Sequence, residues 1–547
     1  MYIIFDTETT GLPRNWNAPI TDTDNWPRVV QIAWQLHDDM GNLIEHQDFL
    51  IKPDGYDIPF DAEQIHGIST ELAQAEGEPL EDVLEKFNIA LTKAKFVVGQ
   101  NIKFDLNVCG CEFVRMEMDT PMSEMPILDT CTETTANLCQ IPGGRGGKFK
   151  LPTLTELHEY LFQVPFSEAH NATADVEATT RCFFELLRRG VFLPEELQRE
   201  ERYIEDFKEF NPKPIGTIGL KHVNLKEASA KFKVNVAPSE VSDDVKDEVL
   251  TELSEYSFAH LHNHTQFSIL QSTIDVPSLV AKAAAHKMKA VALTDTGNMM
   301  AAFHFERAVS NHNKAVQSKR QEAEENGESY DGVEIMPIIG CEFNVCRNLH
   351  DKSVKDNGYQ IVLLAKNKNG YHNLIKLASM AYTDGMYYVP RIDKKAIEEY
   401  KEDLIVLTGN LYGEVPSLIL NVGETQAEEA LIWWKGQFGE DLYIEVMRHG
   451  QENEDRVNET LVRLAEKHSV KLVATNNTYY IEQSDAEAHD VLLCVKDNEL
   501  VSTPKGRGRG FRYGLDNEEY YFKSQEEMKK LFLDLPEAIK SIDEIIA

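Results

Sequence analysis

The sequence has no long apolar segment, and cysteine is scarce for its length. We find no run of eighteen or more apolar residues in 547, so no segment is expected to span a membrane. The first residues, Met1 to Asp6, lack the basic region and cleavage site of a signal peptide. Pairs among the eight cysteines, such as Cys109 and Cys111, lack the matching second pair of a zinc knuckle. Free thiols and a cytoplasmic location are therefore expected.

Positive charge is also scarce. The chain has 55 Lys and Arg against 91 Asp and Glu, a net charge of −36. A protein that coats nucleic acid passively needs Lys and Arg to replace the counterions of the phosphates, so this class is disfavoured. An enzyme that holds nucleic acid locally through metal ions remains compatible with the charge. The one basic stretch, residues 504–512, is nearly as typical of a loop as of a phosphate contact.

The length and the apolar pattern predict two α/β domains joined by an acidic connector. Residues 1–195 alternate short apolar strands with helices, residues 196–256 are rich in acidic residues and proline, and residues 257–547 start a second α/β pattern. In the first domain, strands are expected at Tyr2–Phe5, Val29–Leu36, Phe49–Ile51 and Phe96–Gly99, and helices at Asp82–Leu91 and Ala172–Leu187. The second pattern favours a parallel barrel or an open sheet, with a charged helix and loop at Asn311–Asp331.

Four carboxylates and a histidine follow strands or begin helices in the first domain. Asp6 and Glu8 flank one threonine at the end of the first strand, so their side chains lie on one face. Two adjacent buried carboxylates repel each other unless divalent cations neutralise them. Asp105 follows another strand, and His170 and Asp175 lie at the start of a helix. Hard oxygen ligands of this kind favour Mg²⁺ or Mn²⁺.

These residues resemble the motifs of the DEDDh proofreading exonucleases. The three exonuclease motifs of this family are matched in order by Phe5–Gly11, Asn101–Asp105 and His170–Asp175. A substrate-contacting signature of the family is matched by Gln64–Ile68. Gln100 departs from the family, which often has His before the Asn. The resemblance, over about residues 1–190, implies an RNase H-like fold and two-metal hydrolysis at a 3′ end. It implies metal ligands Asp6, Glu8, Asp105 and Asp175, a general base His170, and substrate contacts from Thr7, Thr9, His66 and Asn101.

The second domain has alternating histidines near its start. The segment Ala259–Ser268 reads Ala-His-Leu-His-Asn-His-Thr-Gln-Phe-Ser, and Leu293–Asn298, Gly340–Phe343 and Asp485–Cys494 extend the pattern. Together they resemble the polymerase-and-histidinol-phosphatase (PHP) domain that opens the alpha subunit of bacterial DNA polymerase III. The resemblance runs from about Phe258 to Ala547 and implies a distorted (β/α) barrel.

Several metal ligands of the PHP family are replaced in this chain. His262, His264 and Glu342 remain. The replaced positions carry Gln271, Thr296, Gln360, Asn410, Asn477 and Tyr479. Neutral amides and a phenol cannot supply the charge and donor strength of a multi-metal cluster. We therefore expect a structural PHP domain whose surviving side chains hydrogen-bond one another, although a single bound cation remains possible.

The leading hypothesis is a proofreading 3′→5′ DNA exonuclease in the N-terminal part of a polymerase III alpha subunit. A frayed or single-stranded DNA 3′ end is the expected substrate. The expected partners are a polymerase core in the same longer chain and replisome subunits such as the sliding clamp. Binding to a membrane is not expected. Two alternatives remain: an exonuclease that trims RNA, and a replisome scaffold with a vestigial nuclease. The chain has no polymerase motif of the Pro-Asp-x-Asp-x-Asp type, so polymerase activity is expected only of a longer chain.

Overall fold

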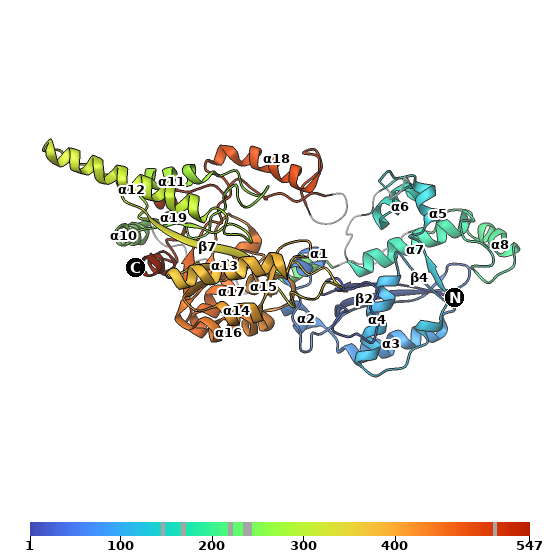
Figure 1. Cartoon of the computed structure of the whole chain (residues 1–547). Coiled ribbons are helices and arrows are strands. Elements are labelled where there is room, and N and C mark those ends of the chain that lie inside the picture. Colours follow the sequence, from blue (N-terminus) through green and yellow to red (C-terminus); the bar gives the residue numbers. More distant parts are fainter. Residues whose placement is uncertain are drawn as a thin grey trace. The chain divides into compact units, whose positions relative to one another are not determined.

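The computed structural model divides the chain into two compact units (Figure 1). It describes residues 1–143, 148–164, 166, 171–216, 223–232, 243–506 and 511–546, with only the backbone of 243–247. One unit holds Met1–Val236 and the other holds Ala237–Leu420 together with Glu424–Ala547. No helix in the described part of the chain is long and apolar enough to cross a membrane.

The first unit is built on a five-stranded sheet in the order β3-β2-β1-β4-β5. Its strands are β1 (Tyr2–Thr9), β2 (Val29–His37), β3 (Leu43–Leu50), β4 (Phe96–Gly99) and β5 (Ile127–Asp129). The strand β2 pairs antiparallel with both β1 and β3. The strand β4 pairs parallel with both β1 and β5. All of β2 is buried. The third strand starts six residues before the predicted Phe49, because the half-exposed edge strand β3 carries polar residues that hide its apolar pattern.

Alternate side chains of β1 enter two different cores. Ile3 and Phe5 pack with residues of α3 (Leu80–Lys93) and α4 (Lys103–Arg115). Tyr2 and Ile4 pack on the other face with residues of α7 (Ala172–Arg188). Because successive side chains of a strand point to opposite faces, one apolar strand joins both layers. Asp6 and Glu8 continue the α7 side of this alternation.

Local hydrogen bonds fix where α7 begins. The side chain of Asn171 accepts a hydrogen bond from the backbone N–H of Thr173, a typical N-cap. Gln31 of β2 accepts from the N–H of Ala172, and its amide donates to Asp48 of β3. The helix start, and with it Asp175, is thus tied to the sheet. The other helices of this unit are α1 (Phe60–His66), α2 (Thr70–Glu76), η1 (Met122–Glu124), α5 (Glu133–Cys139), α6 (Leu154–Phe162), α8 (Arg202–Phe210) and α9 (Leu225–Ala230).

The described part of the segment expected to be a connector contains two helices, α8 and α9, that pack on the first unit. Phe207 of α8 is buried and stacks on Phe184 of α7, with ring centroids 5.8 Å apart. Leu225 of α9 lies in a cluster with Ile68 and Leu72. The helix α10 (Asp243–Ser254) belongs to the second unit. Isolated apolar residues among acidic ones create no visible period, which is why these packed helices are hard to find in the sequence.

The second unit contains a curled seven-stranded sheet. Its order is β12-β11-β10-β8-β7-β6, with β9 beside β7. The strands are β6 (Ala290–Leu293), β7 (Met336–Cys346), β8 (Tyr359–Ala365), β9 (Arg391–Asp393), β10 (Leu404–Leu407), β11 (Leu442–Val446) and β12 (Lys471–Ala474). The strand β8 pairs antiparallel with both β7 and β10, so the sheet is mixed rather than the parallel one predicted. The antiparallel pairs arise because β8 returns alongside β7 without a helical crossover.

The segment 260–264 closes this sheet into a distorted barrel. On one side, the N–H groups of Ala292 and Thr294 donate to the carbonyls of His260 and Asn263. On the other side, the N–H of His264 donates to the carbonyl of Thr478, whose N–H donates to that of His262. Segment 260–264 therefore lies between the end of β6 and the segment after β12, and its three imidazoles are buried.

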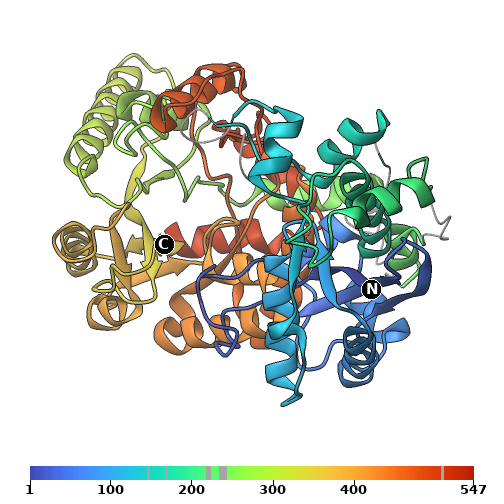
Figure 2. The ribbon, with the colours of Figure 1, turned by 90° about the vertical axis from the view of Figure 1, so that its right-hand side faces the viewer.

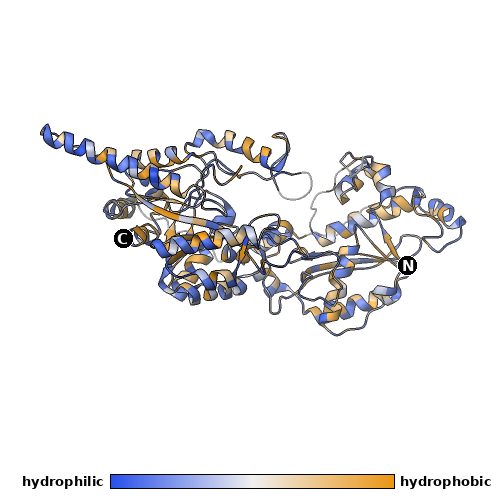
Figure 3. Ribbon diagram, in the orientation of Figure 1, coloured by the Kyte–Doolittle hydropathy of each residue, from blue (hydrophilic) through white to orange (hydrophobic). Residues whose placement is uncertain are grey.

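Helices surround the barrel. They are α11 (Val276–Ala285), α12 (Ala302–Glu325), α13 (Lys368–Thr383), α14 (Lys394–Tyr400), α15 (Glu414–Asn421), α16 (Glu424–Phe438), η3 (Gly439–Asp441), α17 (Glu452–His468), η4 (Gln483–Asp485), α18 (Ala486–Asp497), α19 (Gln525–Leu531) and α20 (Glu537–Ile546). The helix α12 packs beside α11 (Figures 1 and 2). The charged insertion expected from Asn311 is the second half of α12, which is largely hydrophilic (Figure 3).

Candidate functional site

Three predicted metal ligands lie together at the end of β1. Ligand oxygens of Asp6, Glu8 and Asp175 are all within 4.8 Å of one another. Strand alternation places Asp6 and Glu8 on the α7 face, and Asp175 meets them from the first turn of α7. Three converging carboxylates can share one or two divalent cations through oxygen ligands alone.

The fourth carboxylate, Asp105, is held beside this cluster by Thr7. The backbone N–H and the hydroxyl of Thr7 both donate to Asp105 Oδ1, at 3.1 and 2.6 Å. Asp105 lies in the first turn of α4 and is 5% exposed. Thr7 therefore orients Asp105, in addition to the substrate contact that the family resemblance implies for it.

The carboxylates hold protons more tightly than isolated acids do. Burial, and then repulsion by Asp105, Asp175 and Glu8, raises the pKa of Asp6 well above its usual value. Burial and the nearby Asp175 and Asp105 raise the pKa of Glu8 to about 8. Burial also raises the pKa of Asp105 to about 7, although the hydrogen bonds from Thr7 oppose this. The fold thus concentrates negative charge that a cation would relieve.

This donor set fits the expected magnesium or manganese. All the converging groups are carboxylates, and hard divalent cations prefer oxygen ligands. The raised pKa values show that protein groups alone do not compensate the negative charge at the cluster. Asp6, Glu8, Asp105 and Asp175 would hold the ions.

Of the other predicted residues of the nuclease site, His66, Thr9 and Asn101 are described by the structure and His170 is not. His66 ends α1, is buried, and accepts from the N–H of Ile68 at its Nδ1. The Thr9 hydroxyl donates to the carbonyl of Gly11. Asn101 is exposed with a φ of 57°. His170 lies outside the described residues, as do residues 507–510 of the basic stretch.

Asp129 is a residue of this region that the sequence motifs did not indicate. Its Oδ1 accepts from the backbone N–H of Asn101 at 2.8 Å and of Cys131 at 2.7 Å. It thereby supports the unusual left-handed backbone at Asn101. The only signal in the sequence is an acidic residue at the end of an apolar strand. Gln100, the departure from the family, donates to the carbonyl of Pro152 at 2.9 Å.

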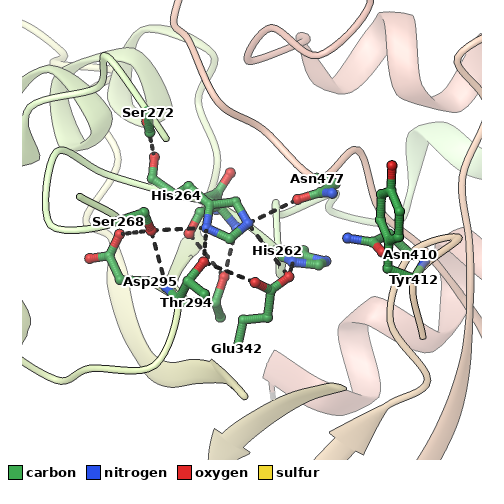
Figure 4. Close-up of polar contacts among 12 residues, drawn as sticks. His262, His264, Ser268, Ser272, Thr294, Asp295, Glu342, Asn410, Tyr412 and Asn477 are labelled. Atoms are coloured by element: carbon green, nitrogen blue, oxygen red, sulfur yellow. Dashed lines mark hydrogen bonds and ion pairs between the residues drawn. The ribbon is translucent and has the colours of Figure 1, made fainter. Parts of the chain in front are cut away.

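The histidines and the glutamate of the PHP-like motif form a hydrogen-bonded core inside the barrel (Figure 4). Atoms of His262, His264 and Glu342 lie within 4.8 Å of one another, and all three residues are buried. His262 Nε2 lies 3.3 Å from Glu342, and Thr296 donates to the other oxygen of Glu342 at 2.9 Å. His264 contacts Asn477 and Ser268, each at 3.0 Å. The side chains left from the PHP ligand set therefore have protein partners.

Glu445 completes this core and was not indicated by the sequence motifs. It lies on β11, and its Oε1 is 2.8 Å from Nδ1 of His262. Burial disfavours a charged imidazole, but Glu445 and Glu342 outweigh it and raise the pKa of His262 to about 10. The imidazolium supplies positive charge between two buried carboxylates. The second oxygen of Glu445 has no hydrogen-bond partner among the described residues, and neither has the side-chain oxygen of Gln360, two features that favour a cation.

The replaced ligand positions divide into two groups. Asn477, Thr296 and Tyr479 contact His264; the Tyr479 ring stacks on it with centroids 4.4 Å apart. In the part of the chain that the structure describes, no hydrogen bond joins the side chains of Gln271, Gln360 or Asn410 to these histidines. Asn410 instead accepts from the N–H of Tyr412 (Figure 4).

Comparison with known families gives the class of each unit. Residues 3–183 match the exonuclease family model, and residues 260–449 match that of the PHP domain. The chain thus carries an exonuclease domain followed by a PHP domain, as the motifs predicted. The RNase H-like and distorted-barrel folds fit these families.

Relatives of known name match about half of the chain. The chain is 36% identical over 288 residues to the DNA polymerase III subunit alpha of Borreliella burgdorferi, over 52% of this chain and 23% of that protein. It is 34% identical over 292 residues to the Thermus aquaticus subunit, over 52% and 22%. It therefore spans less than a quarter of their length. Exonuclease I of E. coli, solved with a dT13 oligonucleotide, is 25% identical over 34% of this chain and 40% of that one, with a TM-score of 0.29.

The predicted resemblance to a polymerase III alpha subunit is confirmed over about half the chain. The two family matches and these relatives together support an alpha subunit of this type that carries its own exonuclease domain.

Proposed function

We propose that the first unit is a 3′→5′ exodeoxyribonuclease that proofreads for a replicative polymerase. The observation that carries this proposal is the convergence of Asp6, Glu8 and Asp175, with Asp105 held beside them. A 3′ terminal nucleotide is the unit it removes. The reaction takes place in the cytoplasm, and polymerase activity belongs to a longer chain.

Each residue of the proposed nuclease site has a separate role in hydrolysis. Two bound Mg²⁺ or Mn²⁺ ions would supply Lewis-acid charge for the attacking water and the leaving 3′ oxygen. Thr7 fixes the orientation of Asp105, and Gln31 and Asn171 fix the start of the helix that carries Asp175. His170 takes the proton of the attacking water, because an imidazole titrates near working pH. His66, Thr9 and Asn101 contact the substrate strand.

The PHP unit serves as a scaffold in this proposal. Its central His262 lies between Glu342 and Glu445, and the raised pKa of its imidazole favours the charged form, which offsets part of their negative charge. Sliding clamp and polymerase core are the proposed partners, by the chemistry of the alpha subunits that the chain resembles. The RNA-trimming alternative rests on the same nuclease motifs and is separated from this proposal by substrate.

The decisive experiment compares matched labelled strands. Single-stranded DNA and RNA of one sequence, labelled at either end, are incubated with the protein in Mg²⁺, in Mn²⁺ and in EDTA. We expect mononucleotides from the 3′ end of DNA and none in EDTA. The same DNA strand is also annealed to a complement with a matched or a mismatched 3′ terminus, and the mismatched terminus should be removed faster. A mismatch favours removal because a single-strand site must first separate the terminal pair.

Asp6→Ala and Glu8→Ala are the controls for contaminating nuclease. Loss of a metal ligand should lower the rate by at least about a hundredfold. Release from the 5′ end, or equal rates on paired and mismatched ends, would contradict proofreading. Preference for RNA would favour the trimming alternative, and inactivity in every condition would favour the scaffold.

A further inference from the structure

The loop between β1 and β2, residues 10–28, presents an exposed tryptophan that contacts the helix carrying Asp105. Trp16 is 51% exposed, and its ring centroid lies 5.7 Å from that of Phe104. Phe104 lies in the first turn of α4, immediately before Asp105. A large aromatic ring left in water has apolar surface that a ligand can cover.

Hydrogen bonds within the loop hold Trp16 in place. The N–H of Asn15 donates to the side chain of Asn25 at 2.7 Å, and the Asn25 amide donates back to the carbonyl of Asn15 at 3.0 Å. Both Asn25 and Trp26 are buried, and the Trp26 indole donates to the carbonyl of Pro19. Trp16 is thus the exposed ring of an otherwise anchored loop.

The loop is also tied to the helix that carries Asp105. Arg115 of α4 donates to the carbonyls of Thr23, Trp26 and Pro27. Fully buried Glu112 of α4 pairs with Arg28, at 2.9 Å. Phe104 lies on α4, and the loop that carries Trp16 is bonded to α4 as well. The position of Trp16 relative to Asp105 is therefore preorganised, which lowers the entropy cost of binding a ligand.

We propose that Trp16 stacks on an unpaired nucleobase of the DNA strand whose 3′ end lies at the carboxylates. This inference rests on the proposed nuclease function and adds a binding site to it. Only a base outside a duplex offers its face, and stacking tolerates every base, so the contact selects single strands rather than sequence. Arg14, two residues before Trp16, and Lys103, directly before Phe104, are both exposed. Neither has an ion pair among the described residues. They can face the phosphates in an otherwise acidic protein.

The test measures strand binding and cleavage in the 547-residue chain with Trp16→Ala, Trp16→Leu and Trp16→Phe. A fluorescent single-stranded 12-mer is the probe, and abasic sites are moved one position at a time from its 3′ end. We expect Trp16→Ala and Trp16→Leu to raise KM at least about fivefold with kcat nearly unchanged, and Trp16→Phe to retain most of the affinity. One abasic position should weaken binding in the wild type but not in Trp16→Ala.

Phe210→Ala is the matched control. Phe210 is 56% exposed in the same unit, on α8, whose Tyr203 bonds to Tyr2 at the opposite end of β1 from Glu8. It should leave KM unchanged. If the wild type cleaves the strand and Trp16→Leu matches it at every abasic position, the stacking site is wrong and the nuclease stands. If the wild type does not cleave DNA, the proposed function itself fails. A Trp16 effect on a protein partner alone would also overturn the stacking site.

Discussion

At the scale of single residues, the Thr7 hydroxyl controls the geometry of a metal ligand. Thr7→Val keeps the shape and the backbone N–H bond but removes the 2.6 Å hydrogen bond to Asp105. Loss of an outer hydrogen bond to a ligand typically costs 10- to 100-fold in metal affinity or activity. We expect the Mg²⁺ concentration for half-maximal nuclease activity to rise by about tenfold or more, while saturating Mg²⁺ restores much of the rate. An unchanged Mg²⁺ titration would show that Thr7 does not position Asp105.

The same cluster predicts a pH dependence of stability in the metal-free protein. The pKa is raised to about 8 for Glu8 and to about 7 for Asp105, so folding favours their protonated forms. Stabilisation by a raised carboxyl pKa is complete below the unfolded value, near 4, and is lost as pH rises through the folded value. Each group contributes a slope of about 1.4 kcal/mol per pH unit in that window. The unfolding temperature of the first unit in EDTA should therefore fall between about pH 5 and pH 8.

Mg²⁺ and one substitution check the origin of this slope. Millimolar Mg²⁺ should flatten it, because the cation replaces the protons, and Glu8→Gln should reduce it and raise the melting temperature at pH 8. The control Glu71→Gln removes an exposed acid of α2 and should change neither. A slope that Glu8→Gln leaves unaltered would place its source outside the cluster.

At the scale of elements, a buried carboxylate joins α4 to the start of β2. Glu112 accepts from Arg28 and from the N–H of Val29, and pairs with Arg115 at 3.1 Å. Glu112→Ala would leave two guanidinium groups and one N–H without this partner, and breaking such a buried pair typically costs about 3–5 kcal/mol. We expect the first unfolding transition in urea to shift by about that amount.

A surface pair provides the comparison for Glu112. Glu78 contacts Lys86 with both side chains more than 40% exposed, and Glu78→Ala should cost less than about 1 kcal/mol. Because Glu112 also supports the loop 10–28, its loss should weaken binding of single-stranded DNA as well. Equal effects of the two substitutions would mean that burial adds nothing to the Glu112 contacts.

At the scale of the whole molecule, the two units should be chemically independent. His262→Ala with His264→Ala should leave the exonuclease rate on short single-stranded DNA nearly unchanged. The second unit should melt earlier, because buried Glu342 and Glu445 each lose an imidazole partner and keep only hydroxyl donors, at about 1–3 kcal/mol for each lost contact. Calorimetry and a 3′-labelled strand separate these two effects.

A companion variant tests whether the barrel hydrolyses anything. With Asp6→Ala and Glu8→Ala together, we expect no metal-dependent nuclease or phosphoesterase activity. If Mn²⁺ or Zn²⁺ restored activity there, and His262→Ala then removed it, the unpartnered oxygen of Glu445 would mark a working metal site. The scaffold role of the PHP unit would then be wrong.

Local order in the chain was enough to predict the two families and most of the strands, together with some of the longer helices such as α3 and α7. Motifs such as Phe5–Gly11 and the repeat of His260, His262 and His264 keep their chemistry within a few residues, and strand alternation places Asp6 and Glu8 on one face without knowledge of the fold. Buried strands such as β1 and β2 are visible because apolar residues are contiguous there.

The tertiary structure alone decided which distant residues support those motifs. Glu445 meets His262 across 183 positions and Glu112 meets Arg28 across 84, and no periodic pattern relates residues so far apart. Most of the exposed edge β3 lies before its predicted core, and the antiparallel direction of β8 was not predicted, for a related reason: the extent and direction of a strand depend on which strand lies beside it, not only on its own side chains. A sequence fixes the chemistry that each residue brings, and only packing of distant segments fixes which groups that chemistry meets.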